Sequence, residues 1–232
     1  MDWLTTRWQP DYTALVISFA YVLGVIGVAE LLRRLRGRHP SFTRKFIHIG
    51  VGMWAIGTVL LFEAWYLAII PPLAFVLINA VSYLFGLVKS MEAGERGNLG
   101  TVYFPLSFAG IIYLFWNEPV LLVASLMPMT WGDAQASIVG QRVGHHQFTV
   151  WGRTRTLEGS LAMLLWSWIT TFLALWLMPI ALALPTPNWL ISLIQAGGVS
   201  LGCTLVEAIS PFGMDNLTVP AAAALLLMRL TG

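Results

Sequence analysis

The feature that most constrains this chain is a series of apolar runs, each about twenty residues long, that recur along its whole length. Such runs match a bilayer's hydrocarbon core, which is about 30 Å thick. With 57% hydrophobic and only 10% charged residues, the chain has too few polar side chains to coat a water-soluble protein of 232 residues. The sequence therefore predicts an all-α integral membrane protein, a polytopic helical bundle of about eight transmembrane helices. The candidate spans centre near residues 22, 54, 75, 108, 128, 170, 198 and 224.

Three of these runs, the second, fourth and last, are short or carry polar residues, so seven or nine spans stay open as alternatives. Proline interrupts others, as in IIPPLAF at 69–75, and a membrane helix tolerates this where neighbouring helices satisfy the freed carbonyls. We therefore expect one compact transmembrane domain over residues 1–232. The first run, 12–32, is longer than a signal-peptide core and is expected to be retained.

Basic residues fall almost entirely on one side of the expected bundle. Because lysine and arginine mark cytoplasmic loops, that side is expected to face the cytoplasm, in a bacterial cytoplasmic membrane, with both termini on the opposite side. Almost all of the chemistry is then expected on the cytoplasmic side. Only Arg7 and Arg229 lie on the other side. The basic connections hold Arg33, Arg34, Arg36, Arg38, Arg44, Lys45, Lys89, Arg96, Arg142, Arg153 and Arg155.

This orientation predicts the behaviour of a cysteine introduced into the 33–44 connection of a variant whose own Cys203 is replaced. An impermeant thiol reagent added to intact cells should leave the introduced thiol unmodified, and should label it after lysis. Labelling of intact cells would reverse the orientation.

Two carboxylates stand at or inside the ends of apolar runs. An ionised group there costs about 3 kcal/mol unless it meets water, a partner or a metal. For Asp133 we favour a functional role, while Glu207 could equally serve to hold an arginine. Glu92 and Glu95 lie in the polar run KSMEAGERGN and are expected to be solvated.

The stretch GDAQASIVGQRVG at 132–144 places Asp133, Ser137, Gly140 and Gly144 on one helical face. Small residues at this spacing are typical of close helix packing, but they also leave a bare backbone beside a carboxylate. The polar stretch that follows, HHQFTVWGRTRTLEG, is expected to be a loop whose arginines and hydroxyls suit phosphate oxygens. Thr156 and Glu158 are also ordinary helix-start residues, and the two roles are compatible.

Five stretches stand out together: GDAQASIVGQRVG, RTLEGS at 155–160, EAISPFGMDNLTVP at 207–220, GNLGTVYFP at 97–105 and TRKFIHIGVG at 43–52. Together they resemble one enzyme family, the CTP-dependent lipid kinases that include phytol kinase and dolichol kinase. That resemblance makes the expected transmembrane domain, 1–232, a catalytic one with its active site on the cytoplasmic side. The resemblance implies transfer of the γ-phosphate of CTP to the hydroxyl of a long-chain isoprenoid or related lipid alcohol, with Mg²⁺. The first two stretches are also similar to those of CDP-diacylglycerol synthases.

Roles carried over from this resemblance form one site. Asp133 and Asp215 would hold Mg²⁺, since hard carboxylate ligands suit that ion. Lys45 and His48, three residues apart on one helical face, would reach the phosphates or the acceptor oxygen, with interfacial anchoring as an equal alternative for Lys45. Arg155 stands where the family usually has lysine, and arginine adds bidentate phosphate contacts. The nucleotide contacts would come from Gly140, Gly144, Arg142, Arg153, Arg155, Thr156, Glu158 and Asn216.

The partners expected are CTP, the lipid alcohol and the bilayer, with a homodimer left open. The basic run RRLRGRH at 33–39 is better explained as a topology signal and a contact to anionic lipid head groups than as a nucleic-acid site. We do not expect nucleic acid as a partner. Two alternatives to the kinase remain. One is a cytidylyltransferase that forms a CDP-lipid from a lipid phosphate, and the other is a transporter with Asp133 and Glu207 on its ion pathway.

Overall fold

The computed structural model describes residues 2–36, 40–85 and 99–231, which are almost entirely helical. Each apolar centre predicted from the sequence falls within a helix or within consecutive helices. The predicted features at Arg38, Lys89, Glu92, Glu95, Arg96 and the first two residues of GNLGTVYFP lie outside the described residues. The helices are α1 (Asp2–Arg36), α2 (Pro40–Gly52), α3 (Trp54–Leu61), α4 (Trp65–Ala68), α5 (Ile70–Phe85), α6 (Gly100–Phe115), α7 (Pro119–Met127), the π-helix η1 (Pro128–Asp133), α8 (Ala134–Val143), α9 (Leu157–Ala181), α10 (Trp189–Ile209) and α11 (Asp215–Thr231).

The described residues include five helical stretches long and apolar enough to cross a membrane. Gly100–Phe115 is a shorter apolar helix. This confirms an all-α polytopic membrane protein, while the count of eight spans stays a prediction. The five stretches are Asp11–Leu35, Phe42–Leu61, Trp65–Phe85, Leu157–Ala181 and Trp189–Ile209.

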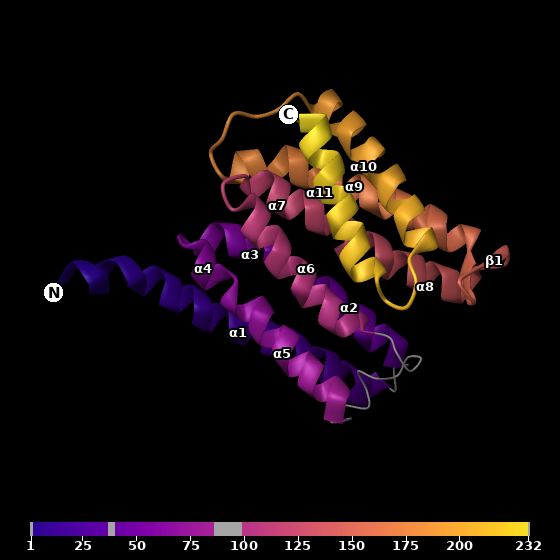
Figure 1. Ribbon diagram of the computed structural model, residues 1–232, viewed down its shortest axis with the longest axis horizontal. Helices are drawn as coiled ribbons and strands as arrows, with labels where there is room; N and C mark the ends of the chain where they lie inside the picture. Colours follow the sequence, from indigo (N-terminus) through magenta and orange to yellow (C-terminus); the bar gives the residue numbers. More distant parts are fainter. Residues whose placement is uncertain (1, 37–39, 86–98, 232) are drawn as a thin grey trace.

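The helices form two groups with α6 between them (Figure 1). On one side lie α1 and α5, which touch where the rings of Phe19 and Phe75 are 6.1 Å apart. On the other side α10 packs against both α9 and α11. Cys203 on α10 is fully buried there, and its thiol donates to the Val219 carbonyl of α11 at 3.7 Å.

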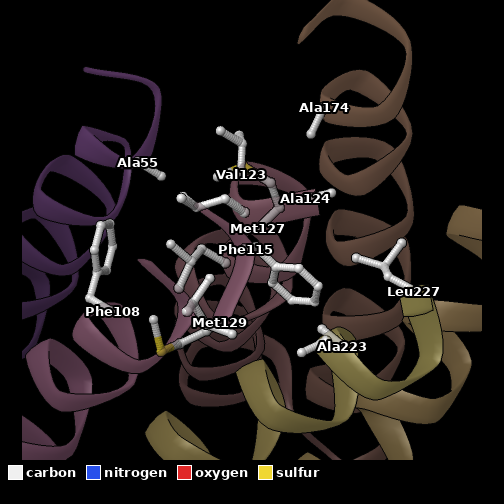
Figure 2. Close-up of a cluster of buried hydrophobic side chains, with 14 of the residues drawn as sticks. Ala55, Phe108, Phe115, Val123, Ala124, Met127, Met129, Ala174, Ala223 and Leu227 are labelled. Carbon is white, nitrogen blue, oxygen red and sulfur yellow. The ribbon is translucent and has the colours of Figure 1, made fainter. Parts of the chain in front are cut away.

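The core centres on α7 and the π-helix that continues it. The sequence of α7, PVLLVASLM, carries no charged side chain, as expected of a helix enclosed on every side. Leu122, Leu126 and Met129 are completely buried. In Figure 2, Met129 and Phe115 lie in the middle of the cluster, between the helices that surround α7. The π-helix η1 ends at Asp133, so the Asp133 carboxylate lies in the interior of the bundle.

The stretch expected to be a polar loop is instead a β-hairpin. Strand β1 (Gln147–Val150) pairs antiparallel with β2 (Arg153–Thr156), and Gln147 lies opposite Thr156. The two linking residues, Trp151 and Gly152, have φ angles of 52° and 74°. Positive φ at both positions is the requirement of a tight two-residue hairpin turn. The hairpin thereby places Arg155 and Thr156 at a fixed position ahead of α9.

Candidate active site

Asp133 is the first centre of the site. It lies where η1 meets α8, and its Oδ2 accepts a hydrogen bond of 2.8 Å from Lys45 Nζ on α2. His48, one turn further along α2, has its Nε2 3.7 Å from the same oxygen and 2.8 Å from the Met129 carbonyl oxygen. Lys45 is only 9% exposed. It therefore belongs to this interior pair rather than to an interfacial anchor.

Arg155 is the second centre. Its guanidinium pairs with Glu207 near the end of α10, and its Nη2 lies 3.7 Å from Asp215 Oδ2 at the start of α11. The same nitrogen donates to the Ser210 carbonyl at 2.9 Å. Burial lowers the pKa of the Arg155 guanidinium, and the Asp215 carboxylate raises it. Because the side-chain pKa of arginine is so high, the group stays charged.

Three carboxylates meet between these two centres. One oxygen each of Asp133, Glu207 and Asp215 lies within 4.8 Å of the others. Carboxylates this close repel one another, so they require cations nearby. Lys45 and Arg155 supply two positive charges against three negative ones, which leaves a formal charge of −1 for a further cation. An all-oxygen donor set with a residual negative charge fits Mg²⁺.

Asn216 holds one of these carboxylates in place. Its side-chain amide donates to Asp215 Oδ1 at 3.0 Å and to the Gly213 carbonyl at 3.3 Å. The backbone carbonyl of Asn216 accepts from the Ser107 hydroxyl of α6 at 2.7 Å. These contacts fix the orientation of the Asp215 carboxylate at the beginning of α11.

Thr156, Gly140 and Gly144 lie where α8 crosses the start of α9. The Thr156 hydroxyl accepts from the Gly159 amide at 3.1 Å and so caps α9. A Cβ on Gly140 would stand 2.9 Å from Thr156 Oγ1, and one on Gly144 would also meet Thr156. The glycines therefore serve close helix packing, as one of the two interpretations expected. A phosphate contact at Gly140 stays a prediction.

Of the other residues predicted to contact the nucleotide, one lines the site and three do not. Arg153 lines a cavity that Asp133 and Arg155 also line, and its guanidinium carbon stands 5.7 Å from the centre of the Phe212 ring. Glu158 accepts from His146 Nδ1 at 2.7 Å, and Arg142 is exposed. Arg142, Gly144 and Glu158 do not line the cavity.

One cavity of about 1590 Å³ contains the site. We call Lys45, His48, Asp133, Arg155, Glu207 and Asp215 the charged cluster, and all six line this cavity. The rest of its lining comes from α1, α2, α3, α5, α6, α8, the hairpin and the starts of α9 and α11, and the part on α1, α5 and α6 is mainly apolar. The cavity thus joins a charged end to an apolar end.

Glu207 is the residue that sequence reasoning left undecided and did not place among the metal ligands. It is 4% exposed and lies with Asp133 and Asp215 in the carboxylate group. The signal was present, since Glu207 stands near the end of an apolar helix as Asp133 does. Its pairing with Arg155 agrees with the alternative in which Glu207 holds an arginine.

Comparison with curated proteins identifies phytol kinases and probable phytol kinases as similar to this chain. The chain is 33% identical to a phytol kinase of Synechocystis sp. over 225 residues, which cover 94% of this chain and 91% of that protein. It is 29% identical to a probable chloroplastic phytol kinase of Triticum aestivum, over 95% of this chain and 77% of the relative. It is 27% identical to the chloroplastic phytol kinase 1 of Arabidopsis thaliana, over 92% of this chain and 73% of that relative. No family model and no solved structure matches.

Proposed function

This chain belongs to the phytol kinase family, and from that premise we propose that it transfers the γ-phosphate of CTP to the hydroxyl of a long-chain isoprenoid alcohol of the phytol or polyprenol type. The reaction would take place at the cytoplasmic face, on the side of the basic connections. The observation that carries the proposal is the single cavity that joins the charged cluster to apolar walls. A phosphate donor and a lipid acceptor require these two environments side by side.

The charged cluster suits phosphoryl transfer because that reaction depends on positioned positive charge more than on covalent chemistry. Asp133 and Asp215 would hold Mg²⁺, with Glu207 as a third oxygen ligand close to both. When bound, Mg²⁺ would neutralise charge that develops on the donor phosphates. Arg155 lines the same cavity, and the guanidinium N–H groups that its contacts with Glu207 and Ser210 leave over would donate to phosphate oxygens.

His48 suits the removal of the acceptor proton. Its Nε2 lies 2.8 Å from the Met129 carbonyl oxygen, which can only accept, so this nitrogen carries the proton. In the neutral ring Nδ1 is then the acceptor, and it would take the proton from the alcohol hydroxyl. Lys45, paired with Asp133, keeps a positive charge beside the reacting groups.

The test is incubation of the purified protein with Mg²⁺, candidate lipid alcohols and CTP that carries a radiolabel on either the α or the γ phosphate. We expect label in the lipid only from γ-labelled CTP. Lipid labelled from the α position, with a lipid phosphate as acceptor, would instead establish a cytidylyltransferase. Absence of transfer from both would overturn the enzyme proposal and favour a transporter.

A further inference from the structure

We propose that the apolar end of the cavity is the binding site for the isoprenoid chain of the acceptor and selects the acceptor by length. This inference rests on the proposed function. We call this part of the cavity the apolar groove. Its characteristic residues are Val22 and Ile26 on α1, Phe75 and Ile78 on α5, and Phe104 and Phe108 on α6.

The groove is long enough for an extended lipid chain. Its lining on α5 runs from Pro71 to Leu84, which corresponds to about 20 Å at about 1.5 Å per residue. That is roughly two-thirds of an about 30 Å hydrocarbon core. A chain in the groove would therefore lie along the helices, at the depth it already occupies in the membrane. A short alcohol would leave most of this length unfilled.

The groove meets the charged cluster at Phe104. The Phe104 ring centre is 4.3 Å from that of His48 and 6.1 Å from that of Phe108. His48 Nε2 is in turn 3.7 Å from Asp133 Oδ2. A chain packed along Phe108 and Phe104 would thus place its hydroxyl end beside His48, where the proposed reaction requires it.

The walls of the groove are mainly apolar and partly open, although Glu30 and Arg33 on α1 and Ser82 on α5 also line the cavity. Asn79 also lines the cavity, but its amide donates to the Thr101 carbonyl of α6 at 2.7 Å, so one of its donors is already engaged. Ile26 on α1 and Ile78 on α5 are 37% and 55% exposed. Because both side chains line the cavity and are also exposed, a membrane-dissolved chain would enter past them without its apolar surface passing through water.

The test compares two neighbouring residues of α5. Ile78 lines the cavity, whereas Leu77 is 68% exposed and does not. In Ile78→Trp, the indole should fill the groove and raise the apparent KM for a long alcohol such as phytol by about tenfold or more. The KM for CTP should not change, and a short alcohol such as geraniol should be affected much less. Leu77→Trp should behave as wild type with both alcohols.

A binding measurement separates this inference from the proposed function. A photoreactive analogue of phytol, added without nucleotide, should label α1, α5 and α6 in wild type and in Leu77→Trp, and label Ile78→Trp weakly. If Ile78→Trp and Leu77→Trp had equal effects on labelling and on KM, the proposal that the apolar groove binds the isoprenoid chain would be overturned. Absence of CTP-dependent transfer in wild type, with labelling intact, would overturn only the proposed kinase activity. If Ile78→Trp does not fold, Ile26→Trp on α1 repeats the test, with the exposed, non-lining Val28→Trp as its control.

Discussion

Asp133→Asn is expected to lower the rate of phosphoryl transfer by about a thousandfold or more while the protein stays folded. The amide keeps the shape of the side chain and still accepts a hydrogen bond from Lys45 Nζ, but it removes the charge proposed to hold Mg²⁺. Loss of a metal contribution of about 4 kcal/mol corresponds to a thousandfold fall in rate. The measurement is γ-phosphate transfer at saturating CTP and alcohol, repeated over a range of Mg²⁺ concentrations.

A matched control is available at Asp11 on α1. This carboxylate is also buried, at 2% exposed, but it accepts from the Glu63 amide and does not line the cavity. Asp11→Asn should therefore transfer phosphate at close to the wild-type rate. Near-normal activity of Asp133→Asn at low Mg²⁺ would remove Asp133 from the metal site.

Arg155 is the position at which the second large effect is expected. Arg155→Lys keeps a positive charge near Glu207 and Asp215 but loses the fork, and loss of one charge-assisted contact costs about 1.5–3 kcal/mol. We therefore expect kcat/KM for CTP to fall by about tenfold to a hundredfold. In Arg155→Ala, kcat/KM for CTP should fall further, because no cation remains at this position for the triphosphate. The KM for the lipid alcohol should hardly change in either variant.

Two sets of saturation curves, with CTP and alcohol varied separately, give these constants. Thermal unfolding must accompany them, because Arg155→Ala leaves Glu207 buried without its partner, a loss of about 3–5 kcal/mol when a buried pair is broken. Equal activity with lysine would show that a point charge is sufficient. Equal activity with alanine would remove Arg155 and RTLEGS from the nucleotide site.

The positions of the helices could be predicted from the sequence because a membrane span is a local property. About twenty apolar residues are sufficient to indicate each one. Asp133 could be recognised for a similar reason, since an ionised side chain at the end of an apolar run is costly wherever the chain folds. The grouping of Lys45 and His48 on one face also followed from helical spacing alone.

The contacts between these elements could not be predicted in the same way. Lys45 and Asp133 are separated by 88 residues, and no local pattern records that their helices meet. The hairpin was missed because its turn contains Trp151 at positive φ, a conformation unusual for a bulky side chain. The sequence could not decide between an arginine contact and a place in the site for Glu207, because the two are compatible: it pairs with Arg155 and lies within 4.8 Å of Asp133 and Asp215.

The burial of Cys203 gives the chain a built-in reporter of its own unfolding. It is the only cysteine of the sequence, it is fully enclosed, and its thiol donates to the backbone of α11. A thiol reagent can therefore modify the native chain only after α10 and α11 separate locally or the whole bundle opens. The rate of modification in detergent solution measures how often this happens. An inactive variant that reacts as slowly as wild type has lost chemistry rather than structure, and this distinction requires no added probe.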